Sequence, residues 1–226
     1  KLMEEKCILF YLKYPEPGQV KKRLASHFGE ELVAELYKNF VIDSLVTLEG
    51  CNAHLKLCFY PPEKEELFVR WMGNVYSYWP QRGNDLGERM KNSFCDAWQE
   101  GYKYAVITGS DIPDLPRSFI DDAFLRLQKN DAVIGPAIDG GYYLIGFRHD
   151  TFFPGVFDGI TWGTETVYEK TLNKLKMGGL SVAPLPVWFD IDTPEELRGL
   201  CERNRNTPFQ SSNTISFIEE NMTGMV

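Results

Sequence analysis

The stretch Lys103–Pro116, KYAVITGSDIPDLP, contains a buried strand and the turn that ends it. Its first half is apolar and β-branched, and a short run of this kind is typical of a strand covered on both faces of a parallel sheet. The strand is followed by Ser110 and Asp111. Pro113 fixes its own φ and disfavours helical backbone in the residue before it, so the chain stays extended here. The stretch therefore predicts a carboxylate at the carboxyl end of a strand.

Strand-like and helix-like segments alternate on both sides of this stretch. We predict strands at residues 7–12, 54–62, 74–81, 104–109, 131–137, 141–147 and 180–185. We predict helices at residues 30–48, 63–72, 86–99, 115–127, 164–177 and 194–204. Strands separated by helices indicate βαβ units and a mainly parallel sheet. The expected domain covers residues 1–205. Residues 206–226 are polar and then weakly amphipathic, and we expect them to form a C-terminal appendage.

The overall composition excludes several classes of protein. The 226 residues carry a formal net charge of −8, so neither nucleic acid nor an anionic membrane is an expected partner. No apolar run approaches the roughly 20 residues that a membrane-spanning helix needs. The five cysteines form no CxxC pair, which favours free thiols in a reducing compartment. We therefore expect a cytoplasmic enzyme, and the sequence leaves a homodimer open.

A basic loop follows the first predicted strand. The segment KYPEPGQVKKRLA, residues 13–25, carries Lys13, Lys21, Lys22 and Arg23 around a Pro-Glu-Pro-Gly turn, and of these Lys13, Lys22 and Arg23 are the candidate site residues. Lysine and arginine at such a place can hold phosphate oxygens, and arginine can do so with two parallel bonds. The loop has neither the spacing of a P-loop nor that of a dinucleotide-binding turn. A solvated helix start with lysines in it is the alternative interpretation.

Acidic residues follow several other predicted strands. In an open α/β sheet the ligand binds at the carboxyl ends of the strands, where Asp85, Asp111, Asp139, Asp190 and Asp192 are expected. Carboxylates gathered at one edge repel one another unless a cation lies between them. A few oxygen ligands facing a basic loop suit Mg²⁺ or Mn²⁺ that bridges a diphosphate. Helix capping by Asp85 or Asp192 and a simple hairpin turn at Asp139 remain the alternatives.

Six segments occur in an order that resembles a known family. They are KYPEPGQVKKRLA, GNDLGERM, TGSDIPDLP, GPAIDGGYYLIGF, ITWGTETV and DIDTPEEL. Together they resemble a bacterial family of proposed glycosyltransferases with the GT-A nucleotide-diphospho-sugar transferase fold, often labelled radical-SAM/selenodomain-associated transferases. The resemblance covers about residues 6–205, and the chain is more distantly similar to the cofactor guanylyltransferases. It implies a three-layer α/β/α sandwich with a Rossmann-like, mainly parallel sheet.

The resemblance also implies roles for individual residues. Asp111 would bind a metal, with Asp192 and Asp190 as a second metal position, and the turn at Asp139 would face the acceptor. Asp139 and Asp111 are the expected catalytic residues. The expected nucleotide-binding residues are Lys13, Lys22, Arg23, Asp85, Gly87 and Ser110. The expected acceptor-binding residues are Gly140, Gly141, Tyr142, Trp162 and Thr164.

Three functions are compatible with this pattern. The first is a metal-dependent transferase that binds a nucleotide diphosphate sugar and moves the glycosyl group to a small acceptor. The second is a nucleotidylyltransferase that joins an NTP to a phosphorylated small molecule and releases pyrophosphate. The third is a non-catalytic nucleotide-binding subunit. The first loop carries KYPEPG where sugar nucleotidyltransferases commonly carry GGxGxR, which leaves both reactions open.

Overall fold

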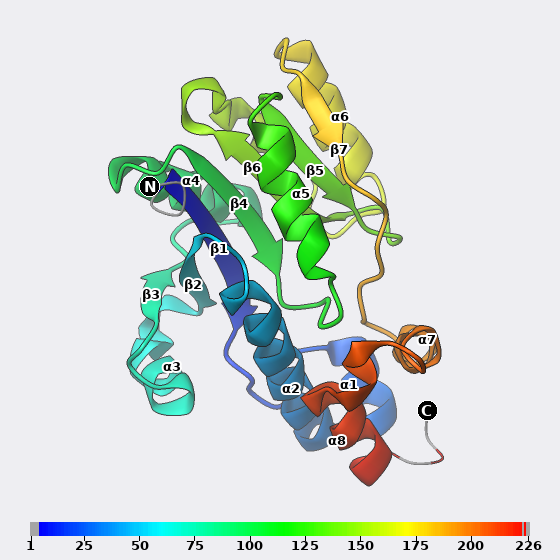
Figure 1. The fold of residues 1–226 in the computed structure, drawn as a ribbon. Helices are drawn as coiled ribbons and strands as arrows, with labels where there is room; N and C mark the ends of the chain where they lie inside the picture. The colour runs from blue at the N-terminus through cyan, green and yellow to red at the C-terminus, as the bar shows by residue number, and fades with distance from the viewer. Residues whose placement is uncertain (1–4, 223, 225–226) are drawn as a thin grey trace.

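The computed structural model describes residues 5–222 and 224, which build a seven-stranded sheet between layers of helices (Figure 1). The strands are β1 (Lys6–Lys13), β2 (His54–Tyr60), β3 (Ser77–Pro80), β4 (Tyr104–Gly109), β5 (Ala132–Pro136), β6 (Tyr142–Arg148) and β7 (Val182–Pro184). The helices are α1 (Lys22–Phe28), α2 (Glu30–Glu49), α3 (Glu65–Met72), α4 (Leu86–Gln99), α5 (Arg117–Leu127), α6 (Val167–Met177), α7 (Pro194–Arg203) and α8 (Asn213–Asn221).

The sheet is mainly parallel, as the sequence predicts. The strand order is β3-β2-β1-β4-β6-β5-β7, and β6 is antiparallel to its neighbours β4 and β5, while the other pairs are parallel. Because β6 runs the other way, its first residue lies at the edge where β1, β4 and β5 end. We call this the carboxyl edge. The turn between β5 and β6 therefore opens onto the carboxyl edge.

The alternation of side chains along β1 explains the three layers. Ile8, Phe10 and Leu12 are buried in a hydrophobic cluster with α1, α2, α5 and α7 on one face of the sheet. Cys7 and Leu9 point the other way, into a second cluster that is packed against α4 and α6. Successive residues of a strand point to opposite faces, so a continuous apolar run is what a strand between two helical layers requires. The expected α/β/α sandwich is confirmed.

Three helices begin later than the sequence predicts, and the one expected from residue 63 begins at Glu65. The helix expected from Thr164 begins at Val167. The Thr164 hydroxyl does not cap it and instead donates to the backbone carbonyl of Thr161 (2.9 Å). The helix expected from residue 115 begins at Arg117. Asp85 caps α4, which is one of the alternatives that the sequence left open, by accepting a hydrogen bond from the backbone N–H of Glu88 (2.8 Å). At the start of α7 the cap is Thr193 rather than Asp192, and Thr193 and Glu196 form a capping box.

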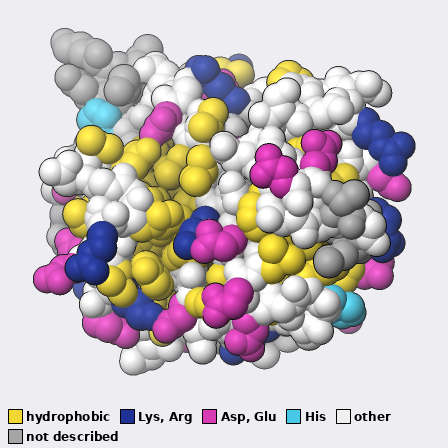
Figure 2. Space-filling view, turned by 90° about the horizontal axis from the view of Figure 1, so that it is seen from below, with side chains coloured by type: hydrophobic (Ala, Val, Ile, Leu, Met, Phe, Trp, Pro, Cys, Tyr) yellow, Lys and Arg dark blue, Asp and Glu magenta, His cyan; other side chains and the backbone are white. Residues whose placement is uncertain are grey.

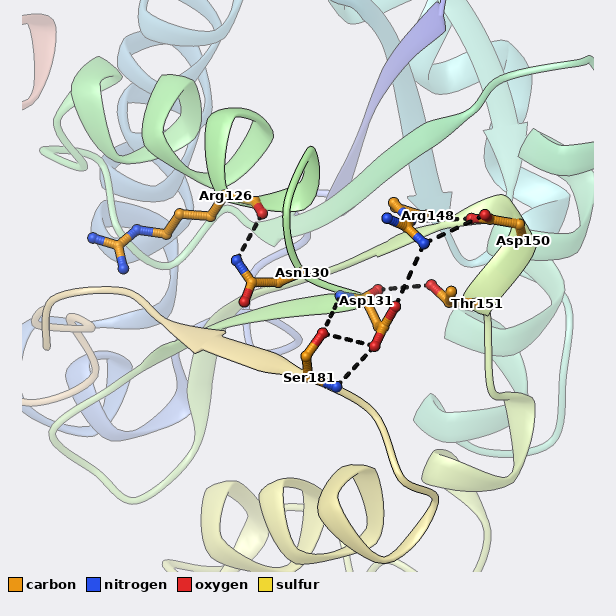
Figure 3. Close-up of polar contacts among 7 residues, drawn as sticks. All are labelled: Arg126, Asn130, Asp131, Arg148, Asp150, Thr151 and Ser181. Carbon is orange, nitrogen blue, oxygen red and sulfur yellow. Dashed lines mark hydrogen bonds and ion pairs between the residues drawn. The ribbon is translucent and has the colours of Figure 1, made fainter.

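A polar cluster fastens the opposite edge of the sheet (Figure 3). Asp131, just before β5, accepts hydrogen bonds from the backbone N–H (2.8 Å) and the hydroxyl (2.7 Å) of Ser181, just before β7. Arg148, at the end of β6, donates to Asp131 and to Asp150. Thr151 donates its hydroxyl to the backbone carbonyl of Asp131. These bonds connect β5, β6 and β7, and they lie away from the carboxyl edge.

The last helix is fastened to the domain. The carboxylate of Asp43 in α2 is buried and accepts hydrogen bonds from the backbone and side-chain nitrogens of Asn213 and from the backbone N–H of Thr214. Ile218 and Met222 join the core cluster on that face of the sheet. Residues 213–222 thus pack on α2, and the division of the chain after residue 205 stays a prediction.

The described cysteines are all free, and Cys7, Cys51 and Cys58 are buried. Within residues 5–222 and 224, no helix combines the length and the apolar character that crossing a membrane requires.

Candidate active site at the carboxyl edge

A cavity of about 560 Å³ opens at the carboxyl edge, beside the ends of β1 and β4. Figure 2 views the molecule from this side and shows a hollow with a hydrophobic floor, next to which basic and acidic side chains meet. The cavity wall includes many of the residues that the sequence predicts for the site. These are Lys13, Lys22, Arg23, Ser110, Asp111, Tyr142 and Asp192. Segments from the start, the middle and the late part of the chain are thus brought to one place.

A lysine that the sequence analysis did not select lies at the centre of the site. Lys21 Nζ is 2.5 Å from Asp111 Oδ1 and 2.8 Å from Asp192 Oδ1. The Lys21 side chain is 3% exposed, whereas the Asp111 and Asp192 side chains are 56% and 36% exposed. The ammonium is therefore enclosed by protein, while the two carboxylates also face the cavity.

These ion pairs control the charges of the site. Burial alone would lower the pKa of Lys21, but Asp111 and Asp192 outweigh burial and raise that pKa above its usual value. Burial would likewise raise the pKa of Asp192, but Lys21, followed by Arg23 and Lys13, holds it below its usual range. The ion pairs thus favour the charged forms of Lys21 and Asp192.

The backbone at Lys21 is unusual. Its φ of 46° and ψ of 50° are left-handed, and Lys21 is the one non-glycine residue with positive φ in the part of the chain that the structure describes. For a residue with a Cβ, this conformation is about 1–2 kcal/mol less stable than the right-handed one. Residues held in this region of φ/ψ space concentrate at functional sites. The ion pairs to Asp111 and Asp192 fix the side chain that this backbone presents.

Hydrogen bonds join the ends of β1 and β4 under the site. The hydroxyls of Tyr37 in α2 and Ser110 are 2.6 Å apart, and the backbone N–H of Lys13 donates to the same tyrosine oxygen (2.9 Å). Ser110 and Tyr37 are buried. The Tyr37 and Ser110 hydroxyls thus bond to each other, and the trio fixes the strand ends from which Lys13 and Asp111 extend.

Asp190 and Asp139 form a separate acidic pair beside the central ion pairs. Burial, followed by the charge of Asp139, raises the pKa of Asp190 to about 6. Asp139 is exposed, and its Oδ1 accepts the backbone N–H of Gly141 (2.8 Å) in a local turn. Neither carboxylate lines the cavity wall. The predicted roles of Asp190 in metal binding and of Asp139 in catalysis remain predictions.

Two further residues of the cavity wall were not selected from the sequence. Arg89 in α4 stacks its guanidinium over the Tyr60 ring, 3.9 Å from the ring centroid. Gln81 is buried and donates its side-chain amide to the backbone carbonyl of Cys58 (2.7 Å). The sequence showed Arg89 only as a residue in the first turn of a predicted helix. Gln81, which follows β3, and Arg89 of α4 both lie in the cavity wall.

Several predicted site residues lie outside the cavity wall. Asp85 is exposed and caps α4. Gly87 packs against the Trp162 ring. A Cβ at Gly87 would lie only 2.8 Å from Trp162 Cζ2, so a larger residue would collide with the ring. Gly140 has a φ of 87°, and its Cβ would lie 2.0 Å from the Glu165 carbonyl oxygen, so its lack of a side chain is explained by the turn itself. The other predicted acceptor-binding residues away from the wall are Gly141, Trp162 and Thr164.

The carboxylates of the site fit a divalent ion only in part. Among residues 5–222 and 224, no group of three aspartate, glutamate, histidine or cysteine side chains could hold a metal ion. Asp111 and Asp192 nevertheless share one cation, since the Lys21 ammonium lies between them. Mg²⁺ is commonly bound by one or two carboxylates, with substrate phosphates and waters as its other ligands. The pair therefore fits a metal ion that arrives with a phosphate-bearing substrate.

Comparison with known families places the chain. The family model described as "Uncharacterized protein conserved in bacteria (DUF2064)" matches residues 44–164, which include β4, Asp111 and the turn at Asp139. The chain belongs to this family. None of the curated proteins compared with the chain matches it.

Solved structures confirm the fold. The chain is similar to a proposed nucleotide-diphospho-sugar transferase from Desulfovibrio desulfuricans G20, with 46% identity, a TM-score of 0.94 and coverage of 97% of this chain and 96% of that one. It is also similar to Rv0371c from Mycobacterium tuberculosis H37Rv in complex with manganese, with 12% identity, a TM-score of 0.53 and coverage of 88% and 98%. A third similar structure is CMP:2-keto-3-deoxy-manno-octonic acid synthetase with CTP, with 10% identity, a TM-score of 0.52 and coverage of 88% and 99%.

These comparisons confirm the resemblance and the nucleotide-diphospho-sugar transferase fold that the sequence predicts. The enzyme class expected from the sequence is also the one that the name of the 46% identical relative carries. At 10–12% identity, the other two structures support the fold alone. None of these comparisons identifies the glycosyl donor or the acceptor of this chain.

Proposed function

We propose that the chain is a metal-dependent transferase that binds a nucleotide diphosphate sugar in the cavity at the carboxyl edge and moves the glycosyl group to a small acceptor. One observation carries the proposal. The cavity wall combines the exposed cations Lys13, Lys22 and Arg23 with the carboxylates Asp111 and Asp192. A diphosphate needs cations for its oxygens, and a metal ion that bridges it needs carboxylates.

The diphosphate would lie between the basic loop and the carboxylates. Lys22 and Arg23 stand at the start of α1, at the same mouth of the cavity as Asp111. The backbone N–H groups of a first helical turn also favour an anion. The cations would stabilise the negative charge that develops on the leaving diphosphate, which is the main electrostatic requirement of the reaction.

Asp111 and Asp192 would hold the metal ion. When bound, such an ion acts as a Lewis acid and neutralises charge on the phosphate oxygens. The chain's own contribution is to aim both carboxylates at one point. The ion pairs with Lys21 support this role, because they already hold the two side chains around one cation.

The acceptor would approach from the turn between β5 and β6. Tyr142, the first residue of β6, lies in the cavity wall, and Asp139 is on the turn that leads into it. We assign to Asp139 the role of accepting the proton of the acceptor hydroxyl. The acceptor-binding roles of Gly140 and Gly141 remain predictions, because a Cβ would meet the Glu165 backbone at Gly140 and the Asp139 carboxylate at Gly141.

Nucleotidyl transfer is the second candidate. Lys13 at the end of β1 and Lys22 and Arg23 at the start of α1 line the cavity as three cations for the phosphates of an NTP, with Lys21 beside them. In that reaction the product released is pyrophosphate, whereas glycosyl transfer releases a nucleoside diphosphate.

The deciding experiment measures binding and release products together. Calorimetry with nucleoside diphosphates, nucleotide sugars and NTPs, each with and without Mn²⁺, identifies the donor. The proposal expects Mn²⁺-dependent binding of a nucleotide sugar and release of the nucleoside diphosphate. Pyrophosphate release from an NTP would establish the second candidate instead. Failure of every nucleotide to bind would overturn both and favour a non-catalytic role.

A further inference from the structure

Lys21 occupies the point at which the charges of Asp111 and Asp192 converge. Its ammonium touches one oxygen of each carboxylate, at 2.5 and 2.8 Å. Coordination of a divalent ion by the same two oxygens would place it beside a buried ammonium. Two cations in direct contact repel each other strongly where protein excludes water. The lysine and the metal ion are therefore alternatives at this position.

We propose that Lys21 holds the metal position in the free protein and gives it up to a divalent ion only when a substrate diphosphate is present to receive the lysine ammonium. This inference rests on the proposed function, because it assumes that a metal ion and a phosphate-bearing nucleotide share the cavity. It adds a condition to that function. Metal and nucleotide each bind weakly alone, and each strengthens the binding of the other.

The surroundings of Lys21 make such an exchange feasible. Lys21 lies in the wall of the same cavity as Lys22 and Arg23, so a phosphate bound to those two residues is within the region that its side chain borders. A lysine side chain is a point charge on a flexible stem, and its ammonium can change partners without a change of the fold. The exposed parts of Asp111 and Asp192 give a metal ion access from the cavity.

The exchange also explains why the metal site is incomplete. Two carboxylates are too few to hold a divalent ion against water, and a resident ammonium weakens its binding further. A diphosphate supplies the missing oxygen ligands and a new partner for Lys21 in one step. Because coupling between two ligands is reciprocal, Mn²⁺ must raise nucleotide affinity by the same factor by which the nucleotide raises Mn²⁺ affinity.

The test measures Mn²⁺ affinity of the full chain by electron paramagnetic resonance and calorimetry, with Mn²⁺ alone and with ADP, GDP, CDP or UDP. In the wild type we expect weak binding of Mn²⁺ alone and an increase of roughly tenfold or more with the best diphosphate. Lys21→Met is expected to bind Mn²⁺ alone roughly tenfold more tightly and to lose most of the coupling. Lys21→Arg keeps the charge and is expected to bind Mn²⁺ alone as weakly as the wild type.

Lys170→Met, which removes an exposed lysine of α6, is the control for the loss of one positive charge and is expected to match the wild type. Lys21→Met that binds Mn²⁺ alone no more tightly than the wild type would overturn the exchange, even if nucleotide and Mn²⁺ bind together. Absence of any nucleotide binding in the wild type would overturn the proposed function instead. If Lys21→Met is unfolded, restoration of the fold by added Mn²⁺ supports the inference, and failure of Mn²⁺ to restore it counts against it.

Discussion

The Lys21 ammonium lies 2.8 Å from a carboxylate oxygen of Asp192, although 171 positions separate the two residues in the chain. The same ammonium contacts Asp111, which follows β4 in the middle of the chain. Segments from the start, the middle and the late part of the chain thus meet at the Lys21 ammonium. If Asp192 and Asp111 receive a metal ion together with a nucleotide, substitutions at this point affect metal-dependent binding before they affect the fold.

Asp111→Asn is expected to weaken Mn²⁺-dependent nucleotide binding by roughly tenfold or more, about 1.4 kcal/mol, while the protein stays folded. Asp111 is 56% exposed, and Lys21 keeps Asp192 as a partner in the variant. Calorimetry with nucleotide, with and without Mn²⁺, measures the effect. Asp121→Asn, at an exposed carboxylate of α5, is the control. Unchanged Mn²⁺ dependence in Asp111→Asn would remove Asp111 from the metal site.

Arg23→Ala is expected to weaken a nucleoside diphosphate far more than the bare nucleoside. Arg23 is exposed in the cavity wall, and a hydrogen bond to a charged group contributes roughly 1.5–3 kcal/mol, or about tenfold to a hundredfold in affinity. Comparison of the two dissociation constants isolates the phosphate contact. Arg205→Ala is a matched change at an exposed arginine outside the cavity wall. An equal loss for both ligands would point to a general disturbance of the cavity.

Gly109→Val is expected to block nucleotide binding with little loss of stability. Gly109 ends β4 and lies in the cavity wall, and a Cβ there would meet no heavy atom within 4 Å. By the alternation of a strand, its side chain would point to the same face as Ile107, which also lines the cavity. Thermal melting and calorimetry together test this. A variant that still binds every ligand of the wild type would show that the nucleotide lies elsewhere.

The sequence predicts the position of a residue well where the end of a strand determines it and poorly where local backbone geometry does. Asp111, Asp192 and Arg23 lie in the cavity wall, and the sequence selects them because ligands bind where parallel strands end; their roles stay predictions. Lys21 could not be separated from Lys22 in the same way, since a left-handed φ at a non-glycine residue has no sequence signal. Asp85 and Gly87 follow a strand too, but a helix cap and the Trp162 ring account for their identities.

The hydrogen bond from the Ser181 hydroxyl to the Asp131 carboxylate is expected to stabilise the folded protein in a pH-dependent way. The Ser181 hydroxyl, followed by its backbone N–H, lowers the pKa of Asp131 in the folded protein. A lowered folded-state pKa gives stability that is present above the unfolded value of about 3.9 and is lost as pH falls through the folded value. Ser181→Ala is therefore expected to melt below the wild type at pH 7, with a gap that narrows below about pH 4.

Thr151→Ala is the matched control for Ser181→Ala. Thr151 donates to the backbone carbonyl of Asp131 rather than to its carboxylate, so its contribution does not depend on the charge of Asp131 (Figure 3). Melting temperatures of both variants and the wild type between pH 7 and pH 3 separate the two. If the Ser181→Ala gap stays constant over this range, the hydroxyl does not stabilise the ionised carboxylate.

Asp139 has two possible tasks that a pair of variants can separate. Its Oδ1 accepts the backbone N–H of Gly141, which fixes the turn between β5 and β6. As the proposed proton acceptor it would also act on the acceptor hydroxyl, where its charge is required. Asp139→Asn keeps an oxygen for the Gly141 N–H and loses the charge. Asp139→Ala loses both the oxygen and the charge.

If Asp139 is the proton acceptor, both variants are expected to lose roughly a hundredfold or more in turnover and to keep the donor affinity of the wild type. That pattern follows because an interaction made only in the transition state lowers turnover without weakening the bound ground state. Steady-state rates and donor dissociation constants, measured side by side, give the answer. If only Asp139→Ala loses activity, the carboxylate serves the turn, since the asparagine can replace it there. If donor affinity falls with turnover in both variants, Asp139 belongs with the nucleotide or the metal rather than with the acceptor.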